Sequence, residues 1–253
     1  MTIDLSELLD DWPYEPGQIN VRLIQGRQGE PIIQVRLDLG VLQMRVEGRP
    51  DGSEPSGYGS LLEYHEARLD GIEFGGDEES DEELILDEDA CRELREEALQ
   101  YYHRYIALLV LEDFEGVLRD TSRNLRVLDL CAEHAESEQD QTILEQFRPY
   151  ITMMRTRALA SLAMNENESK VASFVLDDGI AVIREHFESA GRSEQAGDSS
   201  EVAMLEAMRE ALLPKLPVSQ KSELKQRLKE SIEQENYELA SILRDELRML
   251  GNT

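Results

Sequence analysis

Hydrophobic and polar positions alternate along the first fifty residues of the chain in three separate runs. Their apolar members are Ile19, Val21 and Leu23, then Ile33, Val35 and Leu37, then Leu42, Met44 and Val46. A period of two is typical of strands with one buried face, and short glycine-containing connections at 26–29 and 39–40 favour hairpins. We therefore predict a three-stranded antiparallel meander, whose apolar face needs cover because a small bare sheet is only marginally stable.

From residue 87 onward the apolar positions recur every three or four residues, which is typical of amphipathic helices. Asp87 is placed to cap the first of these helices, which ends near 112–113. Three more long helices are predicted at about 114–135, 139–163 and 169–190, with shorter ones at about 61–68 and 201–213. The long helices form two antiparallel pairs. They resemble tetratricopeptide (TPR) hairpins in architecture, without that family's Trp, Gly and Pro positions, and a plain helical bundle is an equal alternative.

These elements predict an α+β fold that is mainly α. An acidic stretch separates the sheet from the helices, and we interpret it as a solvated connector, with a lure for a basic partner or a metal as the alternative. The predicted organisation is an N-terminal meander with a short helix at 1–70, the connector at 71–86, a helical-pair domain at 87–190, a connecting helix at 200–217 and a two-helix hairpin at 218–253.

The C-terminal hairpin is predicted beyond Pro214 and Pro217, which end the preceding helix. Its facing stripes comprise Leu224, Leu228 and Ile232 in the first helix and Tyr237, Ala240, Leu243, Leu247 and Leu250 in the second. Leu239, Ile242 and Met249 lie on another face of the second helix, which one partner helix cannot cover. Because so short a segment cannot build an adequate core alone, this second face must pack on the body of the protein or on another protein.

Residues 224–250, LKQRLKESIEQENYELASILRDELRML, resemble the UVR motif of the bacterial excision-repair subunits UvrB and UvrC, which also occurs in McsA-type and ClpC-type proteins of regulated proteolysis. The resemblance includes the turn residue Tyr237, and it departs at Leu239, where the family often has alanine. In that family the hairpin pairs with another UVR hairpin or docks a partner protein. The resemblance therefore implies a partner-binding surface, which with the flanking basic positions comprises Lys225, Leu228, Lys229, Ile232, Tyr237, Leu239, Ile242, Leu243, Arg244, Leu247 and Met249.

Charge changes the expected partners. The chain has 26 Lys and Arg against 54 Asp and Glu, a net charge of −28, which repels phosphate backbones and argues against direct nucleic-acid binding. Lys221, Lys225 and Lys229 form a basic stripe that suits either an acidic partner surface or solvent. The chain shows no signal-peptide pattern and no long apolar run, so no membrane is expected. Its only cysteines, Cys91 and Cys131, fit a cytoplasmic protein.

Motifs for catalysis and cofactor binding are missing from the sequence. It has no Gly-x-x-x-x-Gly-Lys-Ser/Thr phosphate loop, so ATP is not expected, and no paired CxxC motifs that would hold zinc. Cys131 and His134 have a ligand-like spacing, but no second pair accompanies them. No nucleophile, base and orienting group converge. We therefore predict no enzyme, no cofactor, no metal and no catalytic residue.

Our leading hypothesis is a non-catalytic adaptor linked to nucleotide excision repair. It docks a protein partner, which is another UVR-hairpin protein or a second copy of itself. One alternative is an adaptor or regulator in a protein-quality-control and proteolysis system. The other is an enzyme with an unrecognised site between the meander and the helices.

Overall fold

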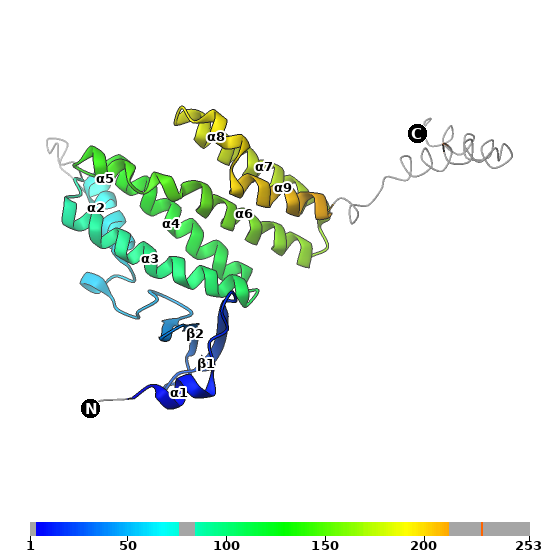
Figure 1. Cartoon of the computed structure of the whole chain (residues 1–253). Coiled ribbons are helices and arrows are strands. Elements are labelled where there is room, and N and C mark those ends of the chain that lie inside the picture. The colour runs from blue at the N-terminus through cyan, green and yellow to red at the C-terminus, as the bar shows by residue number, and fades with distance from the viewer. Residues whose placement is uncertain (1–3, 76–83, 213–228, 230–253) are drawn as a thin grey trace. The chain divides into compact units, whose positions relative to one another are not determined.

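The computed structural model describes residues 4–75, 84–212 and 229 of the 253-residue chain, which form a mainly helical fold with one small sheet (Figure 1). The chain divides into two compact units, Met1–Arg209 and Glu210–Thr253, and nearly all the described residues belong to the first. In chain order the elements are α1 (Ser6–Asp11), β1 (Asn20–Gln25), β2 (Pro31–Leu37), β3 (Gly40–Arg45), the 3-10 helix η1 (Pro55–Gly57), α2 (Leu61–Gly75), α3 (Glu88–Val110), α4 (Phe114–His134), α5 (Glu138–Thr142), the 3-10 helix η2 (Glu145–Phe147), α6 (Arg148–Asn165), α7 (Ser169–Ser189), α8 (Ser193–Gly197) and α9 (Ser200–Leu212).

The three strands form an antiparallel sheet in the order β1-β2-β3, which confirms the predicted meander. Apolar residues lie opposite one another across the sheet, with Ile33 of the central strand between Leu23 and Met44. Ile33 is fully buried. On the other face, the Arg36 guanidinium donates to the carbonyl oxygens of Trp12 at 2.6 Å and Gly40 at 3.1 Å. One buried side chain therefore holds the N-terminal segment and the β2–β3 turn on the sheet.

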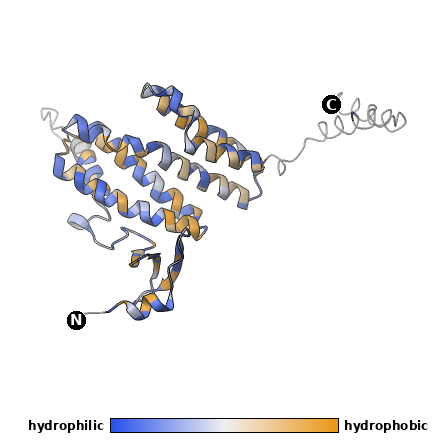
Figure 2. Cartoon of the chain, in the orientation of Figure 1, coloured by the Kyte–Doolittle hydropathy of each residue, from blue (hydrophilic) through white to orange (hydrophobic). Residues whose placement is uncertain are grey.

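The four long helices pack as the two predicted pairs, α3 with α4 and α6 with α7, while α4 also packs against α6. Polar and apolar residues both occur along each of these helices (Figure 2). Asp87 caps α3 as predicted, because its carboxylate accepts the backbone N–H of Ala90 at 2.8 Å. Asp113 caps α4 in the same way, accepting the N–H of Gly116 at 3.0 Å.

The prediction of a single helix at about 139–163 was wrong. The segment instead contains α5, η2 and α6, and the longest of these begins at Arg148. Pro149 occupies the first turn of α6, where its missing N–H costs nothing, but inside a continuous helix it would remove a hydrogen bond and clash with the preceding turn. Two smaller differences are that α2 extends to Gly75 and that α8 lies between the predicted helical-pair domain and the predicted connecting helix.

A shared core joins α2, α3 and α4 with the segment that precedes α3. Leu84 and Leu86 are both buried in this core. The N–H of Leu86 donates to the carbonyl of His134 at 2.8 Å, and its own carbonyl accepts the N–H of Glu136 at 2.9 Å. The start of α3 is thereby fixed beside the end of α4. Among the described helices, none combines the length and apolar character needed to cross a bilayer.

Candidate protein-docking site

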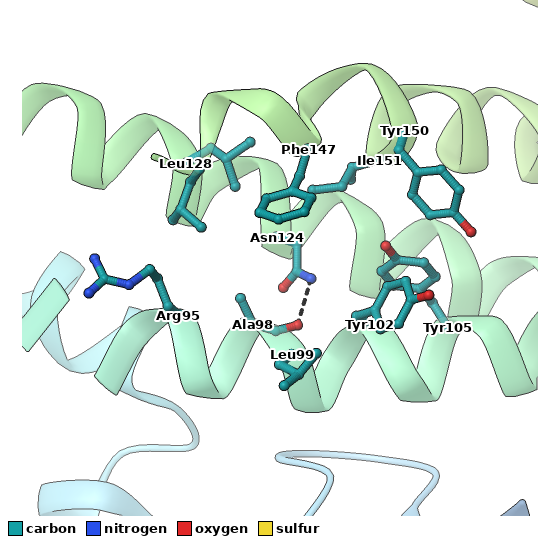
Figure 3. A pocket seen from close by; sticks show the side chains of 11 residues that line it. Arg95, Ala98, Leu99, Tyr102, Tyr105, Asn124, Leu128, Phe147, Tyr150 and Ile151 are labelled. Carbon is teal, nitrogen blue, oxygen red and sulfur yellow. Dashed lines mark hydrogen bonds between the residues drawn. The ribbon is translucent and has the colours of Figure 1, made fainter. Parts of the chain in front are cut away.

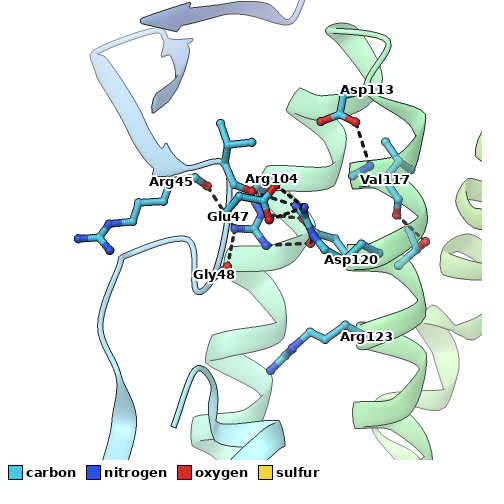
Figure 4. A network of polar contacts seen from close by, with 12 residues as sticks. Arg45, Glu47, Gly48, Arg104, Asp113, Val117, Asp120 and Arg123 are labelled. Carbon is cyan, nitrogen blue, oxygen red and sulfur yellow. Dashed lines mark hydrogen bonds and ion pairs between the residues drawn. The ribbon is translucent and has the colours of Figure 1, made fainter. Parts of the chain in front are cut away.

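The junction between the sheet and the helices is built around a buried ion pair (Figure 4). Arg104 of α3 donates to both carboxylate oxygens of Asp120 of α4, at 2.7 and 2.8 Å. The same guanidinium donates to the carbonyl oxygens of Arg45, at 3.2 Å, and Gly48, at 2.6 Å. Both partners are nearly inaccessible, at 1% and 0% exposure. The pair thus connects α3, α4 and the segment that follows β3.

Glu97 forms a second buried link about two turns before Arg104 on the same face of α3. Its carboxylate accepts the backbone N–H groups of Leu61, at 2.8 Å, and Leu62, at 3.3 Å, and so supplies the start of α2 with hydrogen-bond acceptors. The same carboxylate pairs with Arg123, and with Arg49 at 3.4 Å. A buried charge is stable only when it is paired and hydrogen-bonded. The junction therefore consists of carboxylates that are already engaged, an arrangement suited to holding elements together.

An apolar groove lies over α4, between α3 and the segment where η2 meets α6 (Figure 3). Its volume is about 450 Å³. The residues that line it are Arg95, Ala98, Leu99, Tyr102 and Tyr105 of α3, Asn124 and Leu128 of α4, and Leu144, Phe147, Tyr150 and Ile151 on the opposite wall. The Asn124 side chain donates to the carbonyl of Ala98 at 2.9 Å, so its amide group is used within the floor of the groove.

The two walls meet at one end of the groove. There the Tyr102 ring lies 5.4 Å from the Tyr105 ring and 6.3 Å from the Tyr150 ring, measured between centroids. Burial raises the pKa of both Tyr105 and Tyr150, so their hydroxyls stay protonated at neutral pH. Along the groove, Leu99 is 54% and Phe147 50% exposed. The groove thus offers apolar and aromatic contact surface.

The sequence analysis missed this groove. The aromatic cluster around residues 101–105 was the available signal, but it reads equally well as core packing. Phe147 and Tyr150 gave no signal because the sequence pattern placed them inside one continuous helix. Only the break between η2 and α6 sets these two rings opposite α3.

The partner-binding residues predicted in the C-terminal hairpin fall almost entirely outside the described residues. Lys229 is described, and it is helical and exposed. The predicted positions that lie outside the described residues are Lys225, Leu228, Ile232, Tyr237, Leu239, Ile242, Leu243, Arg244, Leu247 and Met249.

Cys91 and Cys131 are free and buried in the core. Burial raises the pKa of Cys131 to about 12, so its thiol is protonated and is a poor metal ligand. Within 4–75, 84–212 and 229, no cluster of three or more His, Cys, Asp or Glu side chains is placed to hold a metal ion.

Comparison with known proteins identifies the C-terminal segment alone. Residues 219–253 match the family model of the UvrB/UvrC (UVR) motif. No curated protein and no solved structure matches the chain. The match therefore covers the C-terminal segment and does not extend to the sheet or the helical body.

Proposed function

We propose that the protein is a non-catalytic adaptor that docks a partner protein through the UVR motif at residues 219–253. The observation that carries this proposal is the match of that segment to a motif that typically mediates protein–protein interaction. The sequence pattern within the motif supports it, since the spacing of Leu239, Ile242 and Met249 predicts a second apolar face that the two helices of one hairpin cannot bury.

The proposed partner carries its own UVR hairpin or is a second copy of this chain. Two hairpins of the same kind can pack their second apolar faces against each other, so that both faces are removed from water. Because the matching motif is that of UvrB and UvrC, we propose nucleotide excision repair as the process. A role in protein quality control would instead require a chaperone or a kinase-like partner.

The proposed absence of catalysis draws support from the junction between the sheet and the helices, where an enzymatic site was the alternative hypothesis. Its buried carboxylates, Glu97 and Asp120, are each engaged by arginine side chains. A general acid or base must be able to exchange its proton with a substrate, and a carboxylate held by buried arginines is poorly suited to that role.

A pull-down quantified by mass spectrometry tests the adaptor role, with the full chain compared with a chain ending at Pro217. We expect the longer chain to retain a partner that the shorter one loses. Ile242→Glu should weaken retention at least tenfold, because it puts a charge on the second apolar face. Ser241→Glu, which adds the same charge at the neighbouring position, is the matched control. Identical partner sets for the two chains would refute the proposal.

Salt dependence tests the basic stripe separately. Lys225→Glu combined with Lys229→Glu should weaken partner binding at low ionic strength. The difference from the unaltered chain should shrink as salt is raised, because exposed charges are screened beyond about 10 Å at 0.1 M salt. If the loss of partner affinity did not change with salt, these two lysines would contribute through packing and not through their charge.

A further inference from the structure

The groove over α4 lies between two helices that do not close over it. Leu99 on α3 and Phe147 on the opposite wall are large apolar side chains, and each is about half exposed, at 54% and 50%. Monomeric proteins seldom leave large apolar side chains clustered in this way unless the patch binds something. Every lining residue falls between Arg95 and Ile151, and therefore lies outside the UVR motif in the sequence.

The exposed rim of the groove favours a helix over a small ligand. Pockets for small molecules enclose most of the ligand surface, whereas Leu99 and Phe147 on the two walls of this groove stay about half exposed to solvent. Its volume of about 450 Å³ accommodates a few large apolar side chains. A helix lying between two others presents such side chains at three-to-four spacing, which is the usual geometry of a helix bound in a groove.

The charge at one end of the groove indicates which charge the bound helix carries. The groove is closed by tyrosine rings at one end, and Arg95 lies at the other. Arg95 pairs with Asp140, and Leu86 pairs with the backbone of 134–136, so the start of α3 and the segment after α4 meet there. Glu88 lies two turns before Arg95 on the same face of α3 and is exposed, as are Glu136 and Glu138 in the segment after α4. Because Asp140 already pairs with Arg95, these three carboxylates make this end of the groove acidic.

We propose that this groove is a second docking site, which binds an amphipathic helix of a partner protein with two or three large apolar side chains and a basic end. The apolar side chains lie between Leu99 and Phe147, and the basic end lies against the acidic residues around Arg95. The complementary charge speeds encounter and selects basic partners over acidic ones, while apolar burial provides most of the affinity. With the UVR motif, the protein then bridges two partners.

Fluorescence anisotropy with a labelled synthetic peptide tests the site on the full chain. The probe is an 18-residue helical peptide with leucines at three-to-four spacing and lysines elsewhere, and its counterpart has glutamates in place of the lysines. We expect the lysine peptide to bind at least tenfold more tightly than the glutamate peptide. Equal binding of the two peptides would overturn the charge argument and with it the proposal.

Serine substitutions separate binding in the groove from general attraction to an acidic surface. Leu99→Ser combined with Phe147→Ser removes apolar surface without adding charge. This double variant should bind the lysine peptide at least tenfold more weakly. Phe174→Ser combined with Val182→Ser on α7 is the matched control, since those side chains are 70% and 44% exposed, and binding should change less than twofold. Unchanged affinity in the groove variant would overturn the proposal. Both pairs are exposed enough for the fold to tolerate the change, which circular dichroism checks.

Two further measurements exclude other occupants. If a chain ending at Pro217 bound the peptide tenfold more tightly than the full chain, the groove would be filled by the protein's own C-terminal residues and the partner assignment would be overturned. A dimer detected by sedimentation and abolished by the groove variant would likewise replace the partner with a second copy. Ile242→Glu should leave peptide binding unchanged, which keeps this result independent of the UVR motif.

Discussion

Asp120→Asn is expected to loosen the attachment of the sheet to the helical body. The substitution keeps the shape of the side chain but removes the negative charge that pairs with Arg104. The same carboxylate also accepts a hydrogen bond from Arg119 at 3.0 Å. Because Arg104 is 1% exposed, its guanidinium cannot recover the loss from water. Removing one partner of a buried pair costs about 3 to 5 kcal/mol.

Urea denaturation followed by two signals measures this effect. The single tryptophan, Trp12, lies beside the sheet with the Arg22 guanidinium 4.1 Å from its ring centre, so its fluorescence reports on that part of the molecule. Circular dichroism at 222 nm reports on the helices. With a denaturant slope of about 3 kcal/mol per molar, the fluorescence midpoint should fall by roughly 1 to 1.7 M. The dichroism midpoint should fall less, because the helix pairs keep their own contacts.

Glu66→Gln provides the control, because it makes the same carboxylate-to-amide change in the Arg126–Glu66 pair. The side chains of that pair are 55% and 29% exposed, so its loss should cost less than about 1 kcal/mol. A second variant, Asp120→Leu with Arg104→Met, removes both charges and should recover part of the stability lost by Asp120→Asn. If Asp120→Asn shifted both signals by no more than Glu66→Gln, the buried pair would not hold the sheet to the helices.

Three further effects should appear in unfolding experiments. Gly179→Ala should lower stability by about 1 to 3 kcal/mol despite its better helix propensity, because a Cβ there would lie 2.3 Å from Thr156 Oγ1; Thr156→Ala in the same chain should restore most of the loss, and additive effects would refute the clash. Asp87→Ala should lower the free energy of unfolding by about 1 kcal/mol through loss of the α3 cap, measured by thermal melting. A melting temperature equal to that of the unaltered chain would show that the cap does not stabilise the protein. Burial and Arg68 lower the pKa of His65 below 6.5, so the chain should lose stability relative to His65→Gln as pH falls through 6.5, and parallel pH profiles would contradict this.

The sheet and the long helices could be predicted because their signals are local. Alternation around Ile33 and the three-to-four spacing after Asp87 each need only a short window of sequence. The caps confirm this, since the Asp87 carboxylate bonds an N–H only three residues away. The UVR motif was recognisable for the same reason, because its pattern lies within residues 219–253.

The junction and the groove could not be predicted because they depend on distant segments. Arg104 and Asp120 look like ordinary charges on two amphipathic helices, and they are buried because the segment after β3 covers them. The apolar spacing through 139–163 continues across the break before Pro149, so a periodicity argument runs the three elements together. The wall formed by Phe147 and Tyr150 exists only because of that break.

The hydrogen bond from Arg104 to the carbonyl of Arg45 has a consequence for synthesis on the ribosome. The acceptor precedes its donor by 59 residues. At about 5 to 20 residues per second, the sheet emerges roughly 3 to 12 s before the helix that covers it. During that interval the apolar face around Ile33 and two unpaired strand edges are open to other nascent chains. Translation speed between the sheet and α3 is therefore expected to influence how much of the newly made protein escapes aggregation.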